Sequence, residues 1–204
     1  FRFPRCDEGL ARRIVEIVIP VARHLHADGG VAERAHHRLV ERGGMHDDLD
    51  FHETITLRDG RPALIRVMRP DDKPRLQSAF AKLDPQSVYT RFFSYRKSIP
   101  ERAFERIAEI DFVHLAGLVV TIGSGADEII IGGASYVGRS DADGAKVAEV
   151  AFTIEEDFQG QGLASRLLAA LATLARRHGL VRFEAEVLSV NAPMLAVFQR
   201  SGLP

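Results

Sequence analysis

The stretch that decides the fold is Val147-Ala-Glu-Val-Ala-Phe-Thr-Ile154, followed directly by Glu155-Glu-Asp-Phe-Gln-Gly-Gln-Gly-Leu-Ala-Ser-Arg-Leu-Leu168. Its first part is apolar and β-branched, which predicts a strand. A loop with Gly160 and Gly162 follows, and an amphipathic helix then begins. The first N–H groups of a helix have no partners within it, and together with the helix dipole they attract anions. Glycines leave this backbone open to a ligand. The stretch therefore predicts a site for a phosphorylated cofactor.

Three loop patterns compete for this site. A P-loop ends in Gly-Lys-Ser/Thr, but no lysine follows Lys146. A dinucleotide-binding fingerprint has a third glycine where this chain has Ser165, and the acidic residue expected about 20 residues further on has no clear candidate. The pattern [V/I]-x-x-x-x-[Q/R]-x-x-G-x-[G/A] is matched at every position, by Ile154, Gln159, Gly162 and Ala164. A strand-to-helix turn without a ligand remains the alternative.

The matched segment resembles the acyl-CoA-binding motif of the GNAT acetyltransferases, in which backbone amides hold the pyrophosphate of coenzyme A. The resemblance implies acetyl-CoA as co-substrate. It also implies a set of cofactor-binding residues at the strand end, in the loop and at two helix starts: Phe152, Thr153, Ile154, Gln159, Gly160, Gln161, Gly162, Leu163, Ala164, Ser165 and Asn191.

The order of expected elements extends the resemblance. Alternating β-branched runs predict strands over 54–58, 62–68, 114–122, 128–138, 146–154 and 181–188. Helical periodicity predicts helices over 71–82, 99–109, 162–178 and 191–200. This is the GNAT order over residues 62–204, and it implies an α/β fold with a mixed, mostly antiparallel sheet flanked by helices. Four segments look most similar to the bacterial Pat-type protein lysine acetyltransferases, namely 65–72, 83–93, 148–152 and 191–195.

Glu149 is the candidate catalytic residue. Side chains alternate along a strand, so Glu149 is a carboxylate among apolar neighbours in the strand that leads to the cofactor loop. A lysine ammonium must lose a proton before it attacks a thioester, and desolvation makes a carboxylate a better base. The resemblance gives Glu149 the place of the Pat-type general base. The alternative is a Glu that pairs with Lys146 or Arg182 on a solvated sheet face.

Four further features bear on the reaction. In the GNAT family the backbone at the end of this strand pairs with the pantetheine arm and polarises the thioester carbonyl. Asn191 matches a GNAT position at the coenzyme A arm and is equally suited to cap a helix. Phe198 stands where the family usually has a tyrosine that protonates the leaving thiolate, and phenylalanine cannot donate a proton. The cluster Tyr89, Arg91, Phe92 and Phe93 suits either an acceptor groove or core packing.

The first part of the chain differs in pattern from the rest. Residues 1–50 predict a helical hairpin with a linker over 45–53, because Ala11, Val15, Val18, Ala22 and Leu25 recur at helical spacing. We expect the acetyltransferase domain over 54–204. A GNAT sheet usually continues with two more strands, so an end at Pro204 predicts truncation and an exposed sheet edge.

Composition narrows the partners. The net charge of −1 favours neither nucleic acid nor an anionic membrane. No apolar run reaches the length of a membrane span, and the lone Cys6 fits a reducing compartment, so we expect a cytoplasmic protein. The histidine spacings match no metal template, so no metal site is predicted. A homo-oligomer stays open.

The sequence therefore predicts an acetyl-CoA-dependent N-acetyltransferase in which an amine attacks directly and Glu149 removes its proton. By resemblance the acceptor is a protein lysine. Two alternatives stay open. One is acetylation of a small amine, and the other is a non-catalytic acyl-CoA sensor with the N-terminal hairpin as its output element.

Overall fold

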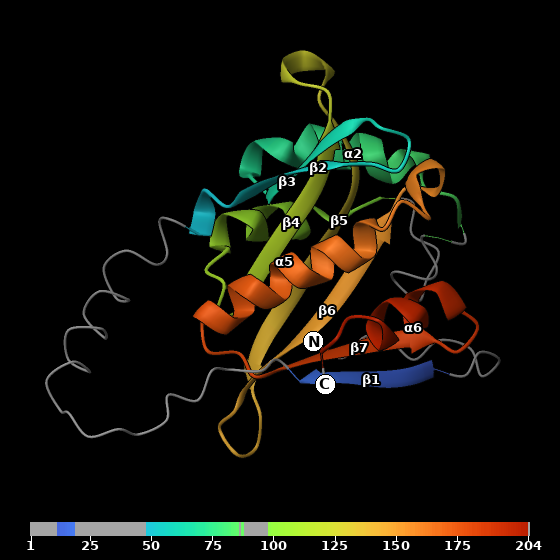
Figure 1. Cartoon of the computed structure of the whole chain (residues 1–204). Coiled ribbons are helices and arrows are strands. Elements are labelled where there is room, and N and C mark those ends of the chain that lie inside the picture. The colour runs from blue at the N-terminus through green and yellow to red at the C-terminus, as the bar shows by residue number, and fades with distance from the viewer. Residues whose placement is uncertain (1–11, 19–47, 86, 88–97, 204) are drawn as a thin grey trace, which may run out of the picture.

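The computed structural model describes residues 12–18, 48–85, 87 and 98–203. Its centre is a seven-stranded sheet with the strand order β1-β7-β6-β5-β4-β3-β2. Neighbouring strands are antiparallel except β6 and β7, which run parallel. Helices lie on both faces of the sheet (Figure 1). The predicted fold class, a mixed sheet flanked by helices, is confirmed.

The elements follow the predicted order from residue 52 onward. The strands are β1 (Arg12–Val18), β2 (His52–Thr56), β3 (Pro62–Val67), β4 (Leu115–Ile122), β5 (Ile129–Ser140), β6 (Lys146–Ile154) and β7 (Arg182–Leu188). The α-helices are α2 (Lys73–Lys82), α4 (Glu101–Glu105), α5 (Leu163–Arg177) and α6 (Ala192–Gln199). The short 3-10 helices are η1 (Pro70–Asp72), η2 (Arg106–Glu109), η3 (Gly125–Asp127) and η4 (Glu156–Phe158). The helix predicted over 99–109 is thus divided into α4 and η2.

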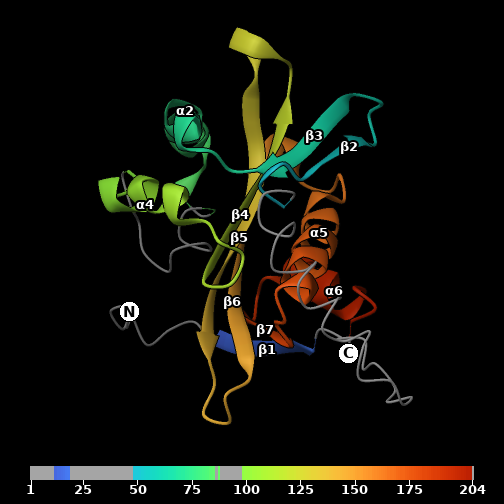
Figure 2. The ribbon, with the colours of Figure 1, turned by 90° about the vertical axis from the view of Figure 1, so that its left-hand side faces the viewer.

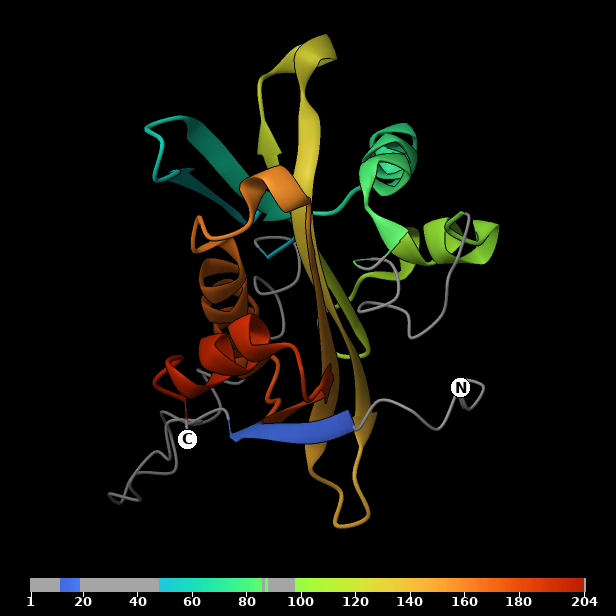
Figure 3. The same cartoon turned by 90° about the vertical axis from the view of Figure 1, so that its right-hand side faces the viewer.

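The helices form two separate layers. Seen along the sheet, α2 and α4 lie on one face and α5 and α6 on the other (Figures 2 and 3). Helix α5 has the most complete apolar stripe, as its sequence predicts: Leu163, Leu167, Leu171 and Leu174 are all buried. These side chains recur every three to four residues, so they share one helix face and pack on the sheet.

A buried ion pair attaches α2 to the sheet. The guanidinium of Arg66 in β3 donates to both carboxylate oxygens of Asp72, at 2.7 Å each. Both side chains are at most 5% exposed. Burial opposes the ionisation of Asp72, but hydrogen bonds from Arg66 and from the backbone N–H of Arg69 outweigh it and lower the pKa of this carboxyl. The network fixes the start of α2 against β3.

The helix predicted near the N-terminus is wrong over residues 12–18. This segment is β1, which pairs with β7 over the whole length of both strands, from Arg12↔Leu188 to Val18↔Arg182. Ile14, Val15, Ile17 and Val18 are β-branched and favour a strand once a partner edge is available. The predicted exposed edge at β7 is wrong for the same reason, because β1 covers it. The rest of the predicted hairpin lies outside the described residues.

The predicted linker over 45–53 is also corrected in its described part. Asp48 is 2% exposed and accepts hydrogen bonds from Arg177 and His178 at the end of α5. His52 already belongs to β2. Residues 48–53 are therefore part of the domain. No helix among the described residues is long and apolar enough to cross a bilayer.

Candidate active site

The strands β6 and β7 diverge next to the glycine loop. Their parallel pairing is confined to Val147↔Arg182, Ala148↔Phe183 and Glu149↔Glu184. On its other side β6 stays paired with β5 as far as Ile154. Within the described chain, the backbone groups of residues 150–154 that point towards β7 therefore have no strand partner. A ligand that offers alternating donors and acceptors can pair with such an edge.

The glycine loop joins this strand end to α5. Gly160 and Gly162 have φ angles of 73° and 83°, which favour glycine. A Cβ atom on either residue would meet nothing within 4 Å, so the backbone faces open space. Gly162 is the N-cap of α5, and no side chain caps this helix. The loop thus presents a helix start to the outside, as its sequence predicts.

The two glutamines of the loop hold its shape. The side-chain N–H of Gln159 donates to the carbonyl of Ile154 at 3.2 Å. The carbonyl of the Gln161 side chain accepts the backbone N–H of Arg58, in the turn between β2 and β3, at 2.8 Å. Both side chains are thus engaged within the protein, and the backbone N–H of Gln159 also donates, to the carbonyl of Glu156 at 3.1 Å. Leu163 is 2% exposed and offers only backbone to a ligand.

Asn191 and Phe198 lie at the start and near the end of α6, the helix that follows β7. The side-chain oxygen of Asn191 accepts the N–H of Met194 at 3.2 Å, so its predicted role as N-cap of α6 is confirmed. Phe198 is 5% exposed, and its ring contacts that of Phe152 edge-on with centroids 5.9 Å apart. Phe198 is therefore a packing residue that joins α6 to β6.

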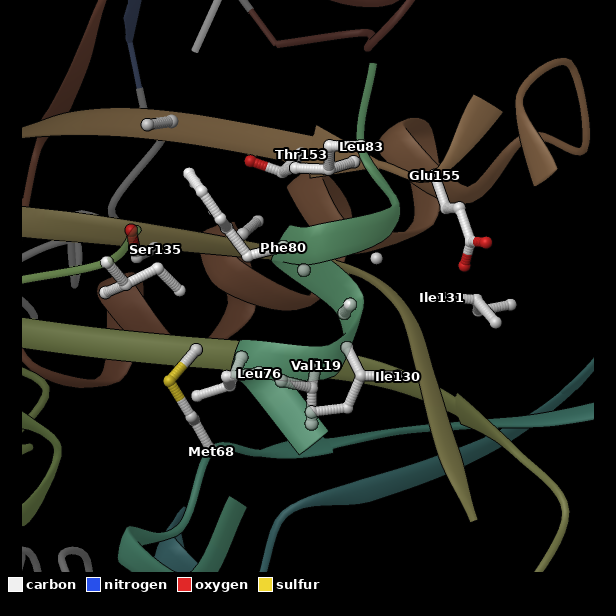
Figure 4. A pocket seen from close by; sticks show the side chains of 16 residues that line it. Met68, Leu76, Phe80, Leu83, Val119, Ile130, Ile131, Ser135, Thr153 and Glu155 are labelled. Atoms are coloured by element: carbon white, nitrogen blue, oxygen red, sulfur yellow. The ribbon is translucent and has the colours of Figure 1, made fainter. Parts of the chain in front are cut away.

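A pocket lies beneath α2, on the face of β6 that points away from α5 and α6 (Figure 2). It has a volume of about 160 Å³ and is bounded by α2, β4, β5 and β6 (Figure 4). Its walls are apolar side chains and glycines, and three polar side chains interrupt them, those of Ser135, Thr153 and Glu155. Figure 4 shows Ser135 and Glu155 towards opposite ends of the pocket.

Glu149 lies on the pocket face of β6 but outside the pocket. Its side chain shares the face of Ala151 and Thr153, which line the pocket. The predicted desolvation is not found, since Glu149 is exposed beside Val137 on β5 and Glu184 on β7. The alternative partners are engaged elsewhere, because Lys146 donates to the carbonyl of His178 and Arg182 pairs with Asp141 and Glu184. Among the described residues no salt bridge or hydrogen bond involves the Glu149 side chain.

Glu155 and Ser135 were not predicted as site residues. For Glu155 the signal was present, because residues 149, 151, 153 and 155 fall on one side of an extended chain. For Ser135 no signal exists in the sequence, since its place depends on the pairing with Ala151. The predicted cluster Tyr89, Arg91, Phe92 and Phe93 lies outside the described residues. In the described part of the chain, no group of His, Cys, Asp or Glu could hold a metal ion.

Comparison with known proteins identifies the family. The model of the acetyltransferase (GNAT) domain matches residues 63–204. The chain belongs to the GNAT acetyltransferase family. The diverging strands and the glycine loop lie within the matched region, so they are features of the GNAT domain itself.

Two solved GNAT structures resemble the chain in different degrees. The GNAT domain of S. lividans PAT is 36% identical with a TM-score of 0.66, and the match covers 74% of this chain and 86% of that domain. The acetyltransferase yncA of Salmonella typhimurium, solved with its cofactor acetyl-CoA, is 21% identical with a TM-score of 0.56. The match to yncA covers 69% of this chain and 78% of that structure, and it supports the fold alone.

The chain is also similar in sequence to a curated Pat protein. The acetyltransferase Pat of Mycolicibacterium smegmatis is 34% identical over 149 residues. The match covers 72% of this chain but only 43% of Pat, so the chain spans less than half the length of this relative.

Proposed function

We propose that the chain transfers the acetyl group of acetyl-CoA to an amine, and that the acceptor is a protein lysine. The observation that carries the proposal is the divergence of β6 and β7 beside an uncapped helix start. A free strand edge and a cluster of helix N–H groups suit the two chemically different parts of one ligand, an amide-containing arm and a pyrophosphate. Coenzyme A has both parts.

Each part has a set of residues that fits it. The backbone of Phe152, Thr153 and Ile154 would pair with the pantetheine arm. Backbone N–H groups between Gln159 and Ser165, Gln161 and Ala164 included, would bind the pyrophosphate. Asn191 at the start of α6 would contact the arm from the far side of the divergence. The open space beyond Gly160 and Gly162 supports this assignment, because a phosphate can approach the backbone there without meeting a side chain.

The chemistry needs little from the side chains of the protein. Bound acetyl-CoA supplies a thioester, whose carbon–sulfur bond breaks as the carbon–nitrogen bond to the acceptor forms, and coenzyme A leaves as the thiolate, which takes a proton from water. Backbone N–H groups at the end of β6 would stabilise negative charge on the thioester oxygen. Glu149 would take the proton that the ammonium must lose, directly or through a water molecule. Because Glu149 is exposed in the free protein, its desolvation would have to come from the bound acceptor.

Protein lysine as the acceptor rests on the similarity to Pat-type enzymes. The exposure of Glu149 supports it, because a side chain of another protein can approach this carboxylate from solvent.

The test combines binding with turnover. Calorimetry with acetyl-CoA and with NAD should show binding of acetyl-CoA only. Glu149→Gln should keep acetyl-CoA affinity and lose at least a hundredfold in kcat on a lysine peptide, in line with the share that general bases contribute. Glu109→Gln, an exposed carboxylate on η2 outside the pocket lining, is the matched control and should keep both. Binding without any acetyl transfer by the wild type would favour the sensor, and binding of NAD alone would reject the whole assignment.

A further inference from the structure

Glu155 is a carboxylate in the pocket, and one of its oxygens has no partner in the part of the chain that the structure describes. It follows the last residue of β6, and its backbone N–H donates to the carbonyl of Ile131 at 3.0 Å, which holds it at the pocket wall. Its Oε2 atom is buried and has no hydrogen-bond partner among the described residues. Figure 4 shows this carboxylate beside Ile131 at one end of the pocket.

An unpartnered carboxylate oxygen is unfavourable in such surroundings. Burial of a charge costs free energy unless a counter-charge or hydrogen-bond donors compensate it. Among the described residues that line the pocket none is Lys, Arg or His. A molecule that enters the pocket could supply the donor that the described lining residues lack.

The walls of the pocket indicate which donor fits. Leu76, Phe80, Val119 and Ile130 offer apolar surface along the way to Glu155. A lysine or arginine side chain has the matching form, because its methylene stem packs on apolar surface while its charged end pairs with a carboxylate. A small cation such as ammonium would leave the apolar walls uncovered.

We propose that this pocket binds a second basic side chain of the acceptor protein, with Glu155 as the specificity-determining carboxylate. The proposal rests on the proposed function and deepens it by naming the substrate class. The acceptor is a segment that carries a lysine for acetylation and another lysine or arginine at a set distance from it.

The spacing along β6 separates the two basic groups. Glu149 and Glu155 are six residues apart on one side of a nearly extended chain, so their Cα atoms lie roughly 20 Å apart at about 3.3 Å per residue. One side chain cannot reach both carboxylates. An extended peptide advances by a similar rise per residue, so this distance corresponds to about six positions. The long side chains of both basic residues can span part of it, so the second basic residue lies about four to six positions from the acetylated lysine.

The test uses peptides with one acceptor lysine and one arginine, the arginine being moved from two to six positions on either side. Each peptide has a partner in which citrulline, a neutral isostere, replaces arginine. In the wild type, a narrow window of positions should raise kcat/KM about tenfold to hundredfold over the citrulline partner, the range expected for a hydrogen-bonded charge pair. Glu155→Gln should abolish that ratio and leave the KM for acetyl-CoA unchanged.

Two variants separate recognition from other effects. Asp157→Asn removes an exposed carboxylate two residues away and should keep the preference for arginine. Glu155→Lys should prefer a peptide with glutamate in the same window. Equal rates for arginine and citrulline at every position in the wild type, or an unchanged preference in Glu155→Gln, would overturn the proposal.

A binding measurement keeps the proposal independent of turnover. Fluorescence anisotropy of the labelled arginine peptide, with acetyl-CoA and the Glu149→Gln protein, should show tighter binding than the citrulline peptide, and Glu155→Gln in the same background should remove the difference. If no peptide is acetylated but this difference is found, the proposed function fails while the basic-side-chain site stands. If peptides are acetylated and no difference is found, the reverse holds.

Discussion

The substitution Gly162→Ala distinguishes the contribution of the glycine loop to stability from its contribution to cofactor binding. The φ angle of 83° lies in the left-handed region, where an alanine costs about 1–2 kcal/mol relative to glycine. The new Cβ would meet nothing within 4 Å, so no clash adds to this cost. We expect the free energy of unfolding to fall by about 1–2 kcal/mol. In a protein of this size the melting temperature would then fall by roughly 2–8 °C.

The effect on cofactor binding should be larger than the effect on the fold. The methyl group would stand in the open space that we assign to the pyrophosphate. Loss of a single hydrogen bond between a backbone N–H and a charged phosphate oxygen corresponds to about tenfold to hundredfold in affinity. The Kd for acetyl-CoA, measured by titration calorimetry at fixed salt, should rise by at least this factor.

Gly144→Ala is the matched control for this experiment. Gly144 lies in the loop between β5 and β6 and has a φ angle of 82°, and a Cβ atom added to it would likewise meet nothing within 4 Å. It should lose the same stability and keep the wild-type Kd. If both variants bind acetyl-CoA like the wild type, the loop does not hold the pyrophosphate; if both bind it weakly, the effect is a general one of strain.

Three further predictions concern the framework. Asp72→Ala should lower the free energy of unfolding by about 1.5–3 kcal/mol in urea denaturation, because the buried guanidinium of Arg66 loses its two shortest charged hydrogen bonds and keeps the longer ones to Glu128. The exposed neighbour Asp71→Ala should change it by less than about 0.5 kcal/mol. Burial opposes the ionisation of Asp111, but hydrogen bonds from His114 and neighbouring backbone N–H groups outweigh it and lower the pKa of Asp111 to about 2. A lowered pKa stabilises the fold above the unfolded value near 4, and this contribution is lost as the pH falls towards 2. The stability difference between wild type and Asp111→Asn should therefore shrink over that interval, and a constant difference would contradict the assignment. Asp48→Ala should cost about 1–3 kcal/mol in thermal unfolding, because the bonds to the end of α5 are lost.

The part of the fold that depends on local pattern could be predicted from sequence. The bounds of β6 agree with those of the predicted strand over 146–154, and α5, predicted over 162–178, lies within one residue of its predicted bounds. Both elements have strong periodicity, and two glycines with positive φ mark the boundary between them. The cofactor loop is local in the same sense, since a single contiguous stretch forms it.

The errors arose where a distant partner decides the structure. Val15 and Val18 recur at helical spacing, but they are β-branched, and the pairing with β7 selects the strand. Glu149 was expected to be desolvated but is exposed. Its burial depends on which elements cover its face of β6, and the sequence of the strand does not contain this information. For Asp48 the partners lie 129 and 130 residues away, so its burial left no trace in the local pattern.

Side chains alternate between the two faces of β6, and this alternation relates the proposed cofactor site to the proposed acceptor site. Ala148, Val150, Phe152 and Ile154 point to the α5 side, where they join the core or pack against it. The intervening residues point to the pocket side, which Glu149 shares with Glu155 beyond the strand end. Under the proposed function, the same strand offers its backbone edge to the cofactor and one face to the acceptor. Deletion of one residue between 150 and 154 would turn Glu149 to the opposite face relative to the loop, so acetyl transfer should be lost even where the loop still binds coenzyme A.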